Sequence, residues 1–121
     1  MRDARDIVIY EEDHQTRTLI KEWLGDAGYR VRIGNRCDAG VDGPCDLVIV
    51  SLYMPKQGGV DYVRGIQEAH PGTPLLATSC QFRPGLTATG STAHHLRVRQ
   101  VLAKPLVRKE LLDVVRVIMA A

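Results

Sequence analysis

The stretch that decides the fold is Asp46-Leu47-Val48-Ile49-Val50-Ser51-Leu52-Tyr53-Met54-Pro55. It begins with an acid, continues through apolar and mostly β-branched residues, and ends at a proline. Such a run is too short for a typical helix. It is typical of a strand buried on both faces, as in a parallel sheet covered by helices. The carboxyl ends of these strands form the crevice where open α/β sheets place their chemistry, and Ser51 is expected there.

The composition limits the class of protein. The 121 residues suffice for one domain, expected over 1–121, and the apolar (45%) and charged (25%) fractions are ordinary for globular proteins. A net charge of +2 with scattered basic residues does not indicate nucleic-acid binding. No apolar run is long enough to span a bilayer and no signal peptide opens the chain, so a cytoplasmic protein without membrane contact is expected. Cys37, Cys45 and Cys80 are expected to be reduced structural thiols.

The rest of the chain alternates strand and helix patterns. Short apolar or alternating runs predict four more strands, at Asp6–Tyr10, Tyr29–Ile33, Pro74–Ser79 and Arg99–Ala103. Helical spacing of apolar residues predicts helices from about Gln15 to Ala27, from Val60 to Ala69 and from Arg108 to Met119. This alternation predicts an α/β three-layer sandwich with a parallel sheet of the flavodoxin-like order 2-1-3-4-5.

Two segments are poor in regular structure. Glycines and Pro44 in the segment 34–45 leave space for only a short second helix. Pro84, Gly85 and Gly90 oppose a stable helix in the segment 81–95, so an irregular fourth helix or a loop is expected there. With few apolar anchors, this second segment is expected to be the most mobile part of the domain.

Polar residues follow the expected strands at their carboxyl ends. Glu12 and Asp13 follow the first strand, Ser51 and Ser79 end the third and fourth, and Lys104 follows the fifth. In this order and spacing the chain resembles the receiver domain of two-component response regulators, the CheY-like fold. The resemblance covers nearly the whole chain. It rests on the acidic turn after the first strand, the stretch 46–55, the turn 58–60, Ser79 and Lys104-Pro105.

The resemblance implies roles for these residues. In that family an aspartate ends the third strand and accepts a phosphoryl group from a histidine kinase; here that position is Ser51. The family's divalent metal, usually Mg²⁺, would be held by Glu12, Asp13 and the backbone carbonyl of Tyr53. Ser79 and Lys104 match the residues that hold the phosphoryl oxygens. Val101 occupies the position of an aromatic residue that moves on activation.

The serine changes the expected chemistry. A carboxylate is ionised at neutral pH, whereas a serine hydroxyl is a weak nucleophile without a base and a weaker ligand for a hard cation. We therefore expect at most weak Mg²⁺ binding, no required cofactor and no reaction catalysed by the chain itself. The leading interpretation is an atypical receiver that acts as a phosphorylation-independent protein-interaction module. Its partner surface is expected on the segment 80–95, the fifth strand and the last helix.

Other interpretations stay open at this point. The chain could accept a phosphoryl group on Ser51, Glu12 or Asp13, or bind a small ligand at the vacated site. Ser51 could equally be a passive small residue, and the acids a solvated turn whose charge Lys104 balances. The neighbouring His94 and His95 are more typical of a solvated loop than of a metal site.

Overall fold

The computed structural model describes residues 5–34, 45–52, 59–79, 98–104 and 106–120, with the backbone alone at 59 and 60. Five parallel strands form one sheet in the order β2-β1-β3-β4-β5. The strands are β1 (Asp6–Tyr10), β2 (Arg30–Ile33), β3 (Leu47–Ser51), β4 (Leu75–Ser79) and β5 (Gln100–Ala103). The flavodoxin-like order that the sequence predicts is therefore confirmed.

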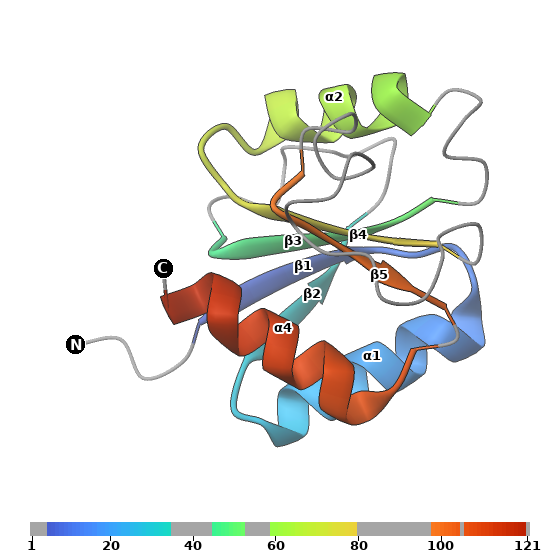
Figure 1. Cartoon of the computed structure of the whole chain (residues 1–121), viewed down its shortest axis with the longest axis vertical. Coiled ribbons are helices and arrows are strands. Elements are labelled where there is room, and N and C mark those ends of the chain that lie inside the picture. Colours follow the sequence, from blue (N-terminus) through green and yellow to red (C-terminus); the bar gives the residue numbers. More distant parts are fainter. Residues whose placement is uncertain (1–4, 35–44, 53–58, 80–97, 105, 121) are drawn as a thin grey trace.

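Three helices cover the sheet in the described part of the chain. They are α1 (His14–Asp26), α2 (Gly59–Ala69) and α4 (Arg108–Ala120). Figure 1 shows α2 on one face of the sheet and α1 with α4 on the other. Their bounds agree with the expected ones to within one or two residues, the usual uncertainty of helix ends. None of these helices is long and apolar enough to cross a membrane.

Two expectations lie outside the described residues. The shortened second helix falls mostly in 35–44, and the irregular fourth helix, with the expected mobility of 81–95, falls in 80–97.

Strand alternation divides the core into two layers. In β1, Ile7 and Ile9 face α1 and α4, whereas Val8 and Tyr10 face α2. Every residue of β3 and β4 is buried, because both faces of these central strands are covered. Edge strand β2 is only partly buried. This difference explains why the stretch 46–52 is continuously apolar whereas 29–33 alternates.

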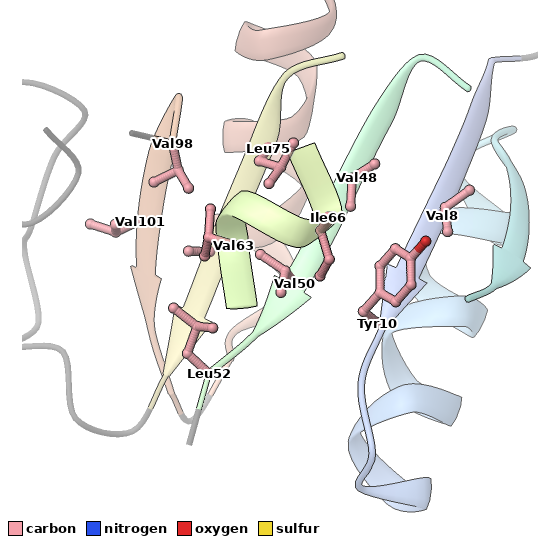
Figure 2. Packing of buried hydrophobic residues seen from close by; sticks show 11 residues of the cluster. Val8, Tyr10, Val48, Val50, Leu52, Val63, Ile66, Leu75, Val98 and Val101 are labelled. Carbon is pink, nitrogen blue, oxygen red and sulfur yellow. The ribbon is translucent and has the colours of Figure 1, made fainter. Parts of the chain in front are cut away.

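The α2-side layer is built from short aliphatic side chains. Val63 and Ile66 of α2 pack over Val50 and Leu75 of the sheet, and Tyr10 belongs to the same cluster (Figure 2). In Figure 2 the Tyr10 ring lies alongside β1, and its hydroxyl points back toward Val8. Tyr10 therefore brings a polar hydroxyl into a layer that consists mostly of aliphatic side chains.

The opposite layer holds α1 and α4 against the sheet. Ile20 and Leu24 of α1 and Leu111 and Val115 of α4 are fully or almost fully buried there. Trp23 is half-buried and packs at the margin of this cluster. Helix α1 ends before Gly28, whose φ of 98° is the left-handed conformation that a helix-ending glycine adopts.

Candidate functional site

Three polar side chains extend the α1/α4 face beyond the carboxyl ends of the strands. Side chains alternate along a strand, so Glu11 follows Ile9, Ser51 follows Ile49 and Lys104 follows Leu102 onto the same face. The backbone N–H of Lys104 still donates to the carbonyl of Ser79 at 3.0 Å, which continues the pairing of β5 with β4. The strand order then brings residues from β1, β3 and β5 to one place.

Lys104 joins the other two residues directly. Its ammonium donates to Oε1 of Glu11 at 2.8 Å and to Oγ of Ser51 at 2.6 Å. The Glu11 side chain is fully buried, the Lys104 side chain is 14% exposed and Ser51 is 5% exposed. A buried carboxylate is tolerated only when it is paired, and Lys104 supplies the partner. Glu11, Lys104 and Ser51 are called the lysine cluster below.

Asp13 has a different role. It is the N-cap of α1, and its Oδ2 accepts a hydrogen bond from the backbone N–H of Thr16 at 2.8 Å. Hydrogen bonding by Thr16 lowers the pKa of Asp13, and the positive charge of Lys104 contributes less. Asp13 therefore lies within the electrostatic reach of Lys104, but its carboxylate is engaged at the start of the helix.

The other residues named from the sequence lie as follows. Ser79 is fully buried at the end of β4, and Val101 is fully buried in β5, paired with Ala77. Glu12 is exposed on the turn after β1. Tyr53 lies outside the described residues.

Thr78 is a further polar residue at this edge. It is the register partner of Ser51 on the neighbouring strand, and its hydroxyl is buried without a hydrogen-bond partner. An unsatisfied buried hydroxyl costs about 1–3 kcal/mol. Thr78 thus places an unsatisfied hydroxyl on β4, between β3, which carries Ser51, and β5, which Lys104 follows.

Sequence reasoning missed Glu11 and Thr78. The sequence predicts Glu12 and Asp13 as the acids after the first strand, whereas Glu11, directly before them, still follows the alternation of Ile7 and Ile9 into the core. That period of two was the available signal for Glu11. Thr78 carried no such signal, because its missing partner depends on the positions of three strands.

The Mg²⁺ that the resemblance implies does not fit the described donors. Glu11 is paired with Lys104, Asp13 accepts a hydrogen bond from Thr16, and Ser51 offers a neutral hydroxyl. Within the described ranges, no group of three or more histidine, cysteine or acidic side chains is arranged to hold a metal ion.

Curated relatives are transcriptional regulators longer than this chain. It is 31% identical over 117 residues to the DNA-binding transcriptional regulator NtrC of Rhizobium meliloti, covering 90% of this chain and 23% of that protein. It is 28% identical over 121 residues to the transcriptional regulatory protein CpxR of Klebsiella pneumoniae, covering 93% and 48%. The chain thus spans between about a quarter and half of the length of these relatives.

Solved structures show the same fold. A response regulator from Thermotoga maritima superimposes with a TM-score of 0.78 at 19% identity, covering 98% of this chain and 99% of that one. The chemotaxis protein CheY4 of Vibrio cholerae gives 0.76 at 19% identity, covering 95% and 98%. The family model described as the response regulator receiver domain matches residues 7–116. The chain therefore belongs to the response regulator receiver domain family.

Proposed function

We propose that this chain is an atypical receiver domain that works in two-component-type signalling through protein contacts, without a phosphorylation cycle of its own. The observation that carries the proposal is the hydrogen bonding of the Ser51 hydroxyl. Its Oγ accepts a hydrogen bond from the Lys104 ammonium, whose charge is matched by the buried Glu11 carboxylate. The acceptor position thus holds a neutral hydroxyl beside a cation.

This arrangement disfavours phosphoryl transfer to Ser51. A serine becomes a strong nucleophile when a neighbouring base removes its proton. The described neighbour is instead the Lys104 ammonium group, which donates hydrogen bonds to Ser51 and to the Glu11 carboxylate. An ionised aspartate can attack a phosphoryl group without a base. Ser51 needs a base, and its described neighbour is a hydrogen-bond donor instead.

The switch position supports the same proposal. Val101 is fully buried in β5 and has no ring to exchange between a buried and an exposed position. A receiver with this residue lacks the aromatic movement that the family uses on activation. The chain is therefore better suited to presenting one constant surface to a partner than to switching between an inactive and an active conformation.

We place the partner surface on β5 and α4, together with the segment 80–95. Helix α4 exposes Val117, which is 70% exposed, next to an exposed ionic group in which Asp113 pairs with Lys109 and Arg116. An exposed apolar residue beside charged side chains suits a protein partner. The partner is a signalling protein or an output domain in the cytoplasm, rather than nucleic acid or a membrane.

The test is incubation with acetyl phosphate and Mg²⁺, followed by intact mass measurement. We expect no phosphoryl adduct on the native chain, whereas Ser51→Asp provides the matched variant with the family's acceptor. An adduct on the native protein that hydroxylamine removes would show an acyl phosphate on Glu12, Asp13 or another acid. An adduct stable to hydroxylamine and mapped to Ser51 would show a phosphoserine. Either adduct would replace this proposal by a phosphoryl-accepting receiver.

A further inference from the structure

A second polar cluster lies in the α2-side layer, on the other face of the sheet from the lysine cluster. Nε2 of His70, the residue after α2, is 2.7 Å from the hydroxyl of Tyr10. Nδ1 of the same ring is 3.7 Å from Sγ of Cys45, which precedes β3. The Tyr10 and His70 rings meet edge to face, with centroids 5.8 Å apart. No part of the proposed function uses these three residues.

The three side chains are arranged like a nucleophile, its base and the group that orients the base. A thiol lies within hydrogen-bond reach of an imidazole, and a third group orients the opposite nitrogen of that imidazole. His70 is 5% exposed and Tyr10 is 2% exposed, whereas Cys45 is only partly buried. Cys45 is thus the most exposed residue of the three, and the two residues that support it are shielded from bulk water.

The same geometry excludes a metal site made from all three side chains. Tyr10 and Cys45 contact opposite nitrogens of the His70 ring, so the three donor atoms cannot converge on one ion. The constellation suits proton transfer instead. With Nε2–H donating to the Tyr10 oxygen, Nδ1 presents a lone pair to the Cys45 thiol.

The resting state of the thiol makes the base necessary. Burial raises the pKa of Cys45, and the positive charge of Arg32 only partly opposes this effect. At neutral pH the sulfur therefore keeps its proton and reacts only if a base removes it. A thiolate of higher pKa is also intrinsically more nucleophilic once it forms.

We propose that Cys45 is an oxidation site for hydroperoxides, with His70 as the base and Tyr10 as the residue that positions it. The thiol proton passes to Nδ1 of His70 while the sulfur attacks the terminal oxygen of the hydroperoxide. A sulfur–oxygen bond forms and the oxygen–oxygen bond breaks. The leaving oxygen takes the proton from His70, which yields a cysteine sulfenic acid and an alcohol, or water when the oxidant is hydrogen peroxide.

Through this reaction the domain would respond to an oxidant, independently of any phosphorylation at residue 51. The added oxygen would enlarge and polarise Cys45 next to His70 at the end of α2 and Tyr10 at the end of β1. Tyr10 directly precedes Glu11, so the modified cluster adjoins the lysine cluster through one peptide bond. The inference stands whether or not Ser51 accepts a phosphoryl group.

The test is treatment of the folded chain with hydrogen peroxide and dimedone, which traps sulfenic acids, followed by peptide mass mapping. We expect labelling at Cys45. In His70→Gln the rate at pH 7 should fall by at least about tenfold, because a positioned base contributes that much or more. The rate should recover as the pH rises through the thiol pKa, since the thiolate then forms without His70. Cys80 in the same sample is the internal reference, and its rate should not change.

Tyr10→Phe provides the second variant, because it removes one hydroxyl and keeps the ring. Its Cys45 rate should fall at pH 7 by less than that of His70→Gln and converge with the native rate at high pH. If His70→Gln does not fold, as judged by circular dichroism, Tyr10→Phe alone decides. Absence of labelling at Cys45, or variant rates equal to or above the native rate at pH 7, would overturn the proposal. A merely structural His70 would give the latter result, since its loss would open the site.

Discussion

At the scale of single residues, Lys104 is the side chain on which the site depends most. It neutralises a carboxylate with no solvent exposure and also donates to Ser51. Breaking a buried ion pair leaves an uncompensated charge, which is far more costly than losing a pair on the surface. The chain contains both kinds of pair, so the comparison can be made within one protein.

We expect Lys104→Met to lower the free energy of unfolding by roughly 3–5 kcal/mol, because Glu11 then stays buried without a partner. The matched control is Lys109→Met, which removes an exposed partner of Asp113 and should cost far less, because solvent screens a surface pair. Urea denaturation measures both. Equal costs for the two variants would show that Glu11 is reached by water or by another cation.

The residue that supports Tyr10 gives a second prediction. A Cβ at Gly34 would lie 2.6 Å from the Tyr10 ring, which cannot withdraw without breaking its hydrogen bond to His70. Gly34→Ala should therefore lower the melting temperature. Gly25→Ala, in α1 with no heavy atom within 4 Å of the new Cβ, should raise it, because alanine favours helix by about 1 kcal/mol. A neutral Gly34→Ala would mean that the ring has another position available.

At the scale of elements, α1 begins at a residue that the family resemblance assigns to metal binding. Asp13 caps the helix through Thr16, and this hydrogen bonding lowers its pKa. A carboxyl with a lowered pKa stabilises the fold above the ordinary value of about 3.9, and the contribution is lost as the pH falls through the lowered value. The helix start is therefore sensitive to acid at this one position.

Asp13→Asn tests that sensitivity, because an amide still caps the helix but carries no charge. The native chain should melt at a higher temperature than the variant above about pH 4, where the carboxylate is ionised. The difference should shrink as the pH is lowered further. Melting curves by circular dichroism from pH 2.5 to 7 measure it. A difference that does not change with pH would show that the charge of Asp13 does not contribute.

The elements were predictable from the sequence because their signals are local. Short apolar runs, and one alternating run at 29–33, predict all five strands, and apolar residues at helical spacing predict the three described helices. The fully apolar run around Ile49 indicates the parallel sheet. The meeting of Ser51 with Lys104 followed from both lying at strand ends. The sequence does not identify Glu11, rather than Glu12 or Asp13, as the partner of Lys104, because the buried acid depends on the residue at which the alternation of β1 ends. The contact of Cys45 with His70 depends on how α2 packs, which no local pattern encodes.

At the scale of the whole molecule, the two polar clusters lie on opposite faces of one sheet and are joined through the consecutive residues Tyr10 and Glu11. The α2-side layer contains Tyr10 and His70, and the α1/α4 side contains Glu11 and Lys104. Both clusters depend on Tyr10 and Glu11, consecutive residues whose side chains point to opposite faces of the sheet. A change at either cluster therefore acts on the end of β1, a central strand that pairs with both β2 and β3.

The charge of the site decides how the domain responds to a cation. The family's site gathers carboxylates whose mutual repulsion a divalent ion relieves. Here Ser51 is neutral and Lys104 already compensates Glu11, so we expect the protein to gain little from binding Mg²⁺. Ser51→Asp adds one anionic ligand and restores the repulsion, and charge count sets the affinity for such ions. Ser51→Asn, which keeps the site neutral, is the matched control.

We therefore expect Ser51→Asp to bind Mg²⁺ more tightly than the native chain, and Ser51→Asn to resemble the native chain. Trp23 is the fluorescent reporter of the titration, because it lies on α1, the helix that follows the acidic turn, and is half-buried against the α1/α4-side core. Its fluorescence should change with Mg²⁺ in the aspartate variant at concentrations that leave the other two unchanged. Calorimetry provides a second measure that does not depend on Trp23. If the native chain binds Mg²⁺ as tightly as Ser51→Asp, then Glu12 and Asp13 bind the ion without help from the acceptor position, and the loss of charge at residue 51 does not explain what sets this receiver apart.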